Sequence, residues 1–417
     1  MRNGSGVPSH TVRTIDVDSH LHEPLDWLAT VDPETAEAIG PPPRFMDIAE
    51  VIFGSSDPTF DRLPEPQRPS RGYDFVPPGF YEHLELTDLM QPESQRASEG
   101  NPYCDPVSRL ALCDERRIDV QFLNPTFLVG MIVAAARRGR FDLIQPVQRA
   151  WNEWAARQVE GHADRLMPVT QIELNDLDWS IAEMTRMRAR GSRSFIIPEA
   201  PVGGRRGELG RSITHPDFDV VWSAAEDLQM AAVAHVGFGR ERVNRGWANN
   251  GASDLVTFGV LNMLVASQTA PQLLLAAMAL DGVFERHPRL VVLVEEVGID
   301  WLPHLLTMLD VSIGHTPTEL RDEHYRPSHV TFGGTYTLPL TPSEYLRRQV
   351  RVTPLAASQP LRAVLDSVPP EMLCFSSDYP HVEGSDHAVE IFERQLEGVD
   401  DAIRTAFFGG VAELLAL

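Results

Sequence analysis

The stretch DVDSHLHEP, residues 16–24, places carboxylates and imidazoles at alternate positions of an apolar segment. Successive side chains of an extended strand point to opposite faces, so we expect Asp16, Asp18, His20 and His22 to project from one side. Glu23 adds a further acid directly after them. Carboxylates and neutral imidazoles are protein ligands of zinc, manganese and iron. This residue pattern therefore predicts a metal site.

Three more candidate ligands, His235, Glu296 and Asp378, follow short apolar runs elsewhere in the chain. Taken singly, His235 also fits a hydrogen-bonding residue, Glu296 a buried salt bridge and Asp378 a turn cap before Pro380. Together, several acids at one buried place would be costly without a compensating cation. We predict an inner ligand set of five residues: His20, His22, His235, Glu296 and Asp378. The last three of these are also the predicted catalytic residues. Asp18 and Glu23 are expected to be further ligands or acids that orient the imidazoles.

Short β-branched runs alternate with helix-like segments, and this alternation indicates parallel βαβ units. The expected strands cover residues 13–20, 118–125, 166–174, 193–200, 230–237, 290–296, 349–354 and 372–380. Helices are expected over residues 143–161, 179–190 and 217–229. Eight such units predict an α/β fold, a (β/α)8 TIM barrel, whose active site lies at the carboxyl ends of its strands. That end of the barrel would bring the candidate ligands together.

Two stretches interrupt the alternation, residues 41–110, which are rich in proline, and residues 238–275. Both exceed the usual loop length, so we expect two insertions on the catalytic side that form a lid and shape the substrate cavity. The whole chain, residues 1–417, is then a single metal-dependent barrel domain. The apolar segment 256–283 is expected to form a pair of barrel helices, and it is also compatible with a homodimer contact.

Composition excludes several classes of protein. The formal net charge of −23 argues against nonspecific binding to nucleic acid or to an anionic membrane. The apolar runs are too short to span a bilayer and no signal peptide precedes them, so we expect a cytoplasmic protein. The three cysteines are too scattered for a thiolate zinc site. All 36 basic residues are arginine, which excludes lysine Schiff bases and a carboxylated-lysine metal bridge.

The motifs DVDSHLHEP, AHVG, EEVGIDWLP and SSDYPHVEG resemble the amidohydrolase superfamily, in the branch of the carboxymuconate-semialdehyde and benzoate-type decarboxylases. The resemblance runs from residue 13 to residue 385. It implies metal ligands at the strand-one pair, at the strand-five histidine and at the strand-eight aspartate. These positions correspond to His20 with His22, or alternatively Asp18 with His20, and to His235 and Asp378.

One position departs from those decarboxylases, whose sixth strand ends in a catalytic histidine. Here the segment reads VEEVGIDW; we take Glu296 as the matching residue and expect Glu295 to point to the opposite face. This acid, together with the DxDSHxHE start at residues 16–23, makes the chain similar to the TIM-barrel nonheme diiron monooxygenases of platensimycin- and platencin-type diterpenoid biosynthesis. That resemblance implies two irons, dioxygen, an electron donor that stays unidentified, and a substrate linked to coenzyme A. The expected phosphate partners are Arg240, Arg242 and Arg245.

The alternative is a mononuclear enzyme with one zinc or manganese, either a hydrolase or a nonoxidative decarboxylase. It predicts activity without oxygen. His304 and His315 are reserve ligands, and each fits a structural role better. His381, in DYPH, is expected just outside the ligand sphere, where it would hydrogen-bond a ligand or the substrate.

Overall fold

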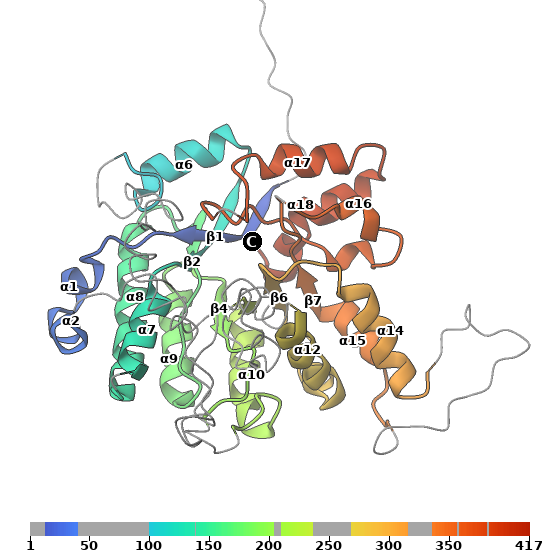
Figure 1. Cartoon of the computed structure of the whole chain (residues 1–417), viewed down its shortest axis with the longest axis horizontal. Coiled ribbons are helices and arrows are strands. Elements are labelled where there is room, and N and C mark those ends of the chain that lie inside the picture. The colour runs from blue at the N-terminus through green and yellow to red at the C-terminus, as the bar shows by residue number, and fades with distance from the viewer. Residues whose placement is uncertain are drawn as a thin grey trace, which may run out of the picture.

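The computed structural model describes residues 13–40, 100–137, 139–203, 210–236, 268–315, 336–356, 358–381 and 383–417. Within these ranges seven strands lie in the middle of the molecule with helices around them (Figure 1). The strands are β1 (Ile15–Leu21), β2 (Val120–Pro125), β3 (Leu166–Pro168), β4 (Ser194–Ile197), β5 (Ala231–His235), β6 (Val292–Glu295) and β7 (Val350–Val352). All pairings between them are parallel, so the predicted α/β class is confirmed.

Backbone hydrogen bonds join the strands into a ring. The two sheets have the orders β1-β2-β3 and β4-β5-β6-β7, and a parallel bridge between Thr170 and Phe195 connects them. The expected eighth strand is an extended segment after residue 372. Its Cys374 amide donates to Val352 of β7, and its Phe375 carbonyl accepts from the Val17 amide of β1. This segment fills the place between β7 and β1, as a TIM barrel requires.

Side chains alternate between the inside of the ring and the helix layer. In β5, for example, Ala231 and Val233 belong to the inner apolar cluster, while Ala232 and Ala234 belong to the outer cluster that the helices cover. Every strand is buried along its whole length, as expected of parallel strands that are covered on both faces. Val411 of the last helix joins the inner cluster, so this helix packs against the amino-terminal end of the barrel.

Helices surround the ring, and the three helices that the sequence predicts are among them. The three predicted helices correspond to α8 (Ile144–Gln158), α9 (Leu177–Arg188) and α10 (Asp219–Leu228). The other helices near the strands are α6 (Pro106–Glu115), α7 (Leu128–Arg137), α12 (Ala270–Leu280), α13 (Val283–Arg286), α14 (Leu302–Ser312), α15 (Pro342–Gln349), α17 (Ala388–Gln395) and α18 (Asp401–Leu415). Three further short helices in the described ranges are α1 (Trp27–Val31), α2 (Pro33–Ile39) and α16 (Leu361–Val364).

Most of the two predicted insertions, residues 41–99 and 237–267, lies outside the described residues. The last residues of each predicted insertion belong to a helix: those of the first to α6 and those of the second to α12. Their role as lids stays a prediction, and so do the single-domain organisation, the homodimer and the cytoplasmic location. In the described ranges no helix is long and apolar enough to cross a bilayer.

Candidate metal centre

An extra residue in β1 decides which side chains of DVDSHLHEP enter the barrel. Asp16 pairs with Gln121 of β2 and Ser19 pairs with Leu123, so three steps along β1 match two along β2. Such a bulge breaks the two-residue alternation of side chains. Val17 and Asp18 both face inward in consequence, and Asp16 lies on the outer side with Gln121. The expectation that Asp16 shares a face with Asp18 is therefore wrong.

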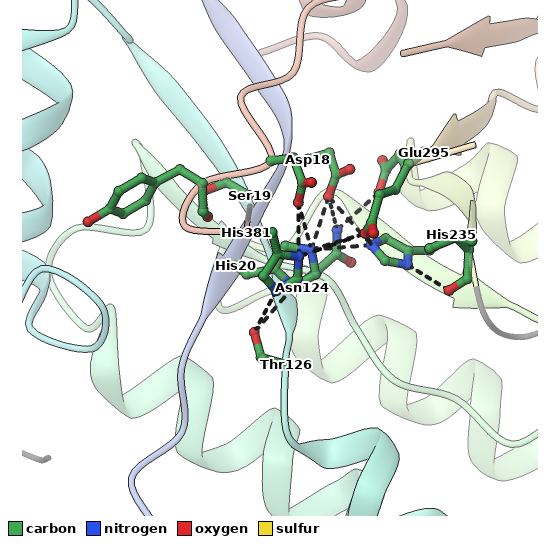
Figure 2. A network of polar contacts seen from close by, with 12 residues as sticks. Asp18, Ser19, His20, Asn124, Thr126, His235, Glu295 and His381 are labelled. Carbon is green, nitrogen blue, oxygen red and sulfur yellow. Dashed lines mark hydrogen bonds and ion pairs between the residues drawn. The ribbon is translucent and has the colours of Figure 1, made fainter. Parts of the chain in front are cut away.

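Two imidazoles meet nitrogen to nitrogen at the carboxyl ends of the strands (Figure 2). Nδ1 of His20 lies 3.1 Å from the Pro125 carbonyl, and Nδ1 of His235 lies 3.0 Å from the Val236 carbonyl. A carbonyl only accepts, so each Nδ1 carries the hydrogen and a neutral ring presents a lone pair at Nε2. The two Nε2 atoms are 3.2 Å apart. Either a proton or a metal cation must lie between them, because two lone pairs cannot bond to each other.

Three carboxylates surround this pair of imidazoles. Asp18 Oδ1 lies 3.4 Å from Nε2 of His20 and 3.7 Å from Nε2 of His235. Glu296 Oε2 is 3.1 Å from Nε2 of His235, and Asp378 Oδ1 is 3.6 Å from Nε2 of His20. Asp18 Oδ2 and Asp378 Oδ2 are buried and accept no hydrogen bond from the residues described here. Buried oxygens of this kind fit the second bonding position of a metal-binding carboxylate.

The ligand atoms fall into two overlapping groups, each with all atoms within 4.8 Å of one another. The first group comprises Asp18, His20, His235 and Glu296, and the second comprises His20, Glu296, Asp378 and His381. Imidazole nitrogens and carboxylate oxygens suit zinc or manganese. The chain thus offers a donor set that fits a divalent cation.

The charges of the cluster are set by burial and by each other. Burial alone would lower the pKa of His235, but Glu296 and Asp18 raise it well above the ordinary value. Burial would raise the pKa of Glu296, yet the His235 cation holds it well below its usual range. Burial and then Glu296 raise the pKa of Asp378 well above that of a free aspartate. Without a metal, the site therefore holds a protonated His235 beside an ionised Glu296.

Left-handed backbone conformations aim two of the carboxylates. Glu296 has a φ of 56° and Asp378 a φ of 51°, which are uncommon values for residues with a side chain. The last residue of β6, Glu295, already points inward. The left-handed conformation of Glu296, the next residue, turns its side chain to the same site. Glu295 accepts a 3.0 Å hydrogen bond from Asn124, whose amide also donates to Asp18. The expectation that Glu295 points to the opposite face is wrong, since both acids enter the barrel.

Gly384 makes room for the turn at Asp378. A Cβ atom on Gly384 would lie 2.3 Å from the Ser377 carbonyl oxygen and 2.6 Å from that of Asp378. No side chain fits at those distances, so the backbone of the strand-eight turn lies directly against this glycine. The glycine of SSDYPHVEG thus supports the ligand segment physically.

Two residues of the predicted ligand set lie outside both groups. The His22 ring stacks on Tyr103 with centroids 5.2 Å apart, and both of its nitrogens are buried without a hydrogen bond among the described residues. Glu23 accepts from the amides of Phe127 and Leu128 and from the Trp151 indole. It caps the start of α7, so its oxygens are already engaged. Of the two ligand pairs left open for strand one, the structure brings Asp18 and His20 together.

His381 lies closer to the centre than the sequence indicated. Its Nδ1 is 3.1 Å from Asp378 Oδ1 and 3.8 Å from Glu296 Oε2. The reserve ligands His304 and His315 are exposed and belong to neither group. The three arginines expected to bind phosphates, Arg240, Arg242 and Arg245, lie outside the described residues.

Sequence reasoning missed Asn124, although a signal was present. This residue ends β2, at the same edge as the candidate ligands, and it lies in the predicted strand 118–125. Its amide bridges Asp18 and Glu295, so it orients one carboxylate of the site (Figure 2). A polar residue at the carboxyl end of a barrel strand is the feature that would have identified it.

Solved structures of similar fold include decarboxylases and amidohydrolases. An amidohydrolase from Mycobacterium avium subsp. paratuberculosis K-10 has a TM-score of 0.64 at 20% identity, covering 98% of this chain and 100% of its own. A 5-carboxyvanillate decarboxylase from Sphingomonas paucimobilis has a TM-score of 0.59 at 19% identity, with 98% and 100% covered. A dihydroxybenzoic acid decarboxylase from Polaromonas sp. JS666, with bound manganese and 2-nitroresorcinol, has a TM-score of 0.57 at 13% identity, with 98% of each chain covered. No curated protein sequence matches the chain.

These neighbours overturn the oxygenase expectation. A diiron monooxygenase acting on a coenzyme A thioester was inferred from Glu296 in place of a histidine, together with the DxDSHxHE start of the first strand. These neighbours are decarboxylases and amidohydrolases, three of them with bound manganese, and they do not support an oxidoreductase or two irons. A single manganese or zinc fits better. The inference failed because ligand-type residues alone do not define the reaction; here Glu296 pairs with His235 at 3.1 Å.

The family itself is shown by the sequence. A family model described as amidohydrolase matches residues 17–415, nearly the whole chain from β1 to α18. The match includes every residue of the two ligand groups. The chain therefore belongs to the amidohydrolase family.

Proposed function

We propose that the protein is a mononuclear metal-dependent enzyme that decarboxylates a small aromatic carboxylic acid without an oxidant. The observation that carries the proposal is the 3.2 Å approach of the two Nε2 atoms of His20 and His235 among three carboxylates. A proton or a metal cation must lie between these atoms, and the buried oxygens of Asp18 and Asp378 that accept no hydrogen bond from the described residues support the metal. Decarboxylases among the structures of similar fold support the choice of reaction.

His20, His235 and Asp18 would hold a single manganese or zinc, with Glu296 and Asp378 completing the donor set. Such a cation, when bound, withdraws electron density from substrate oxygens that bind next to it. The protein itself fixes the imidazoles, since the Nδ1 hydrogens of His20 and His235 are bound to backbone carbonyls. This second contact sets the tautomer that leaves Nε2 free for a metal.

His381 is placed to supply the proton that replaces carbon dioxide on the substrate. Burial by itself would lower its pKa, but the carboxylates of Asp378 and Glu296 raise it well above the ordinary value. Its side chain is 18% exposed, more than the other members of the two groups, so it lies at the outer edge of the cluster. As the carbon–carbon bond breaks, the electron pair left on the ring carbon takes this proton.

The experiment combines metal analysis with product analysis. Wild type and a His235→Ala variant are stripped with chelator, reloaded with manganese or zinc under nitrogen, and incubated with a panel of hydroxybenzoates. We expect about one metal per wild-type chain, carbon dioxide release without oxygen, and loss of both in the variant. His304→Ala is the matched control, because this exposed histidine belongs to neither ligand group.

Hydrolysis is the second candidate function, because an amidohydrolase shares the fold. A parallel panel of amides and lactones tests it under the same conditions. Hydrolysis without carbon dioxide release would replace the proposed reaction and keep the metal site. Wild type that binds no divalent metal would contradict both.

A further inference from the structure

A fully buried arginine lies directly behind the metal ligands of β1. Arg109 of α6 is 1% exposed, and its guanidinium donates to two groups of β1: Ser19 Oγ at 2.5 Å and the His20 carbonyl at 2.9 Å. Two further donors bind Gln121 Oε1 at 2.7 Å and the Pro102 carbonyl at 3.0 Å. A planar guanidinium suits such a fixed set of acceptors. An apolar residue would fill the same space without the cost of removing a charge from water, so the hydrogen bonds of Arg109 are the reason for an arginine here.

The same arginine holds the strand-eight turn. Its guanidinium carbon lies 4.6 Å from the centre of the Tyr379 ring, on the residue after Asp378. The Tyr379 carbonyl accepts from the His20 amide at 2.8 Å and from Ser19 Oγ at 3.2 Å. Arg109 therefore contacts both segments that carry ligands, although it belongs to neither ligand group itself.

Asp16 binds Ser377, the residue before Asp378. It accepts from the Ser377 amide at 2.8 Å, from Ser377 Oγ at 2.6 Å and from Gln121 Nε2 at 2.8 Å. Ser377 Oγ in turn accepts from the Tyr379 amide at 3.1 Å. Both neighbours of Asp378 are thus held by side chains that lead back to Arg109.

We propose that Arg109 and Asp16 are positioning residues, which hold the backbone of β1 and of the strand-eight turn so that Asp18, His20 and Asp378 converge on one cation. The inference rests on the proposed metal function. A left-handed conformation such as that of Asp378 persists only where surrounding contacts enforce it, and this network supplies those contacts. Outer contacts of metal ligands commonly change metal affinity by about 10–100-fold.

The test measures manganese affinity rather than turnover. Metal-free wild type, Arg109→Gln and Asp16→Asn are titrated with Mn²⁺, and free ion is followed by electron paramagnetic resonance at a temperature where circular dichroism shows each folded. We expect the dissociation constant to rise by about 10–100-fold in both variants. Arg116→Gln is the matched control: this arginine also lies over Tyr379, at 5.3 Å, but it binds the surface residue Asp386.

A second control separates affinity from stability. Leu346→Ala removes a fully buried side chain of α15, which is not part of the network, and should lower the melting temperature without changing Mn²⁺ affinity. Folded Arg109→Gln with wild-type affinity overturns the proposal. If that variant does not fold, Ser19→Ala decides, because it deletes only the Ser19 contacts to Arg109 and Tyr379; unchanged affinity there also overturns it. Wild type that binds no Mn²⁺ refutes the proposed function instead.

Discussion

His235 should control both the stability of the metal-free protein and its response to metal. Without a cation its imidazolium is the 3.1 Å partner of the buried Glu296 carboxylate. With a cation bound as proposed, its Nε2 would be a ligand. In the metal-free protein, His235→Ala removes the partner of Glu296; in the metal-bound protein, it removes a proposed ligand. The stability of each form is therefore a separate measurement.

The magnitudes follow from burial and chain length. Removing one member of a buried ion pair costs about 3–5 kcal/mol, because the other charge stays buried. Unfolding entropy of about 2.1 cal/mol/K per residue gives roughly 0.9 kcal/mol/K for 417 residues. The metal-free variant should therefore melt about 3–6 °C below metal-free wild type. Manganese at 100 times its dissociation constant adds about 2.7 kcal/mol, or about 3 °C, to wild type alone.

Differential scanning fluorimetry with chelator and with increasing Mn²⁺ measures both effects. His304→Ala, which changes an exposed side chain, should behave as wild type in each condition. Two results would refute the reasoning. One is a variant whose melting temperature still rises with Mn²⁺ as in wild type; the other is a metal-free variant as stable as metal-free wild type.

Two further predictions concern residues that support the site. Burial raises the pKa of Glu23 from 4.5 to about 7, so its contribution to stability is fully present below pH 4.5 and about 3 kcal/mol is lost as pH rises from there to 7. Glu23→Gln should flatten the fall of the urea midpoint between pH 5 and pH 8, and an unchanged slope would contradict this. Gly384→Ala should push the backbone at Asp378 away, costing about 1–3 kcal/mol and weakening Mn²⁺ binding in a titration. Gly410→Ala in α18, where a Cβ atom meets only ordinary contacts, should do neither.

The fold and much of the site were predictable from the sequence. Seven of the eight predicted strands form, because most of them are short runs rich in apolar residues, as expected of parallel strands covered on both faces, and such runs are visible locally. Carboxyl ends of such strands meet at one edge, and this rule alone placed His20, His235, Glu296 and Asp378 near each other. The reaction did not follow from those residues, since the same donors serve several chemistries.

What the sequence determined by itself is the alternation of elements and the residue types at the strand ends, because both depend on neighbours along the chain. Only the tertiary structure decided that Asp16 faces away from Asp18, that Glu295 and Glu296 both enter the barrel, and that His22 lies apart. The β1 bulge depends on pairing with β2, and the turn at Asp378 depends on Gly384 beneath it. These long-range contacts override the two-residue alternation, which a strand's own sequence predicts without knowledge of its partners.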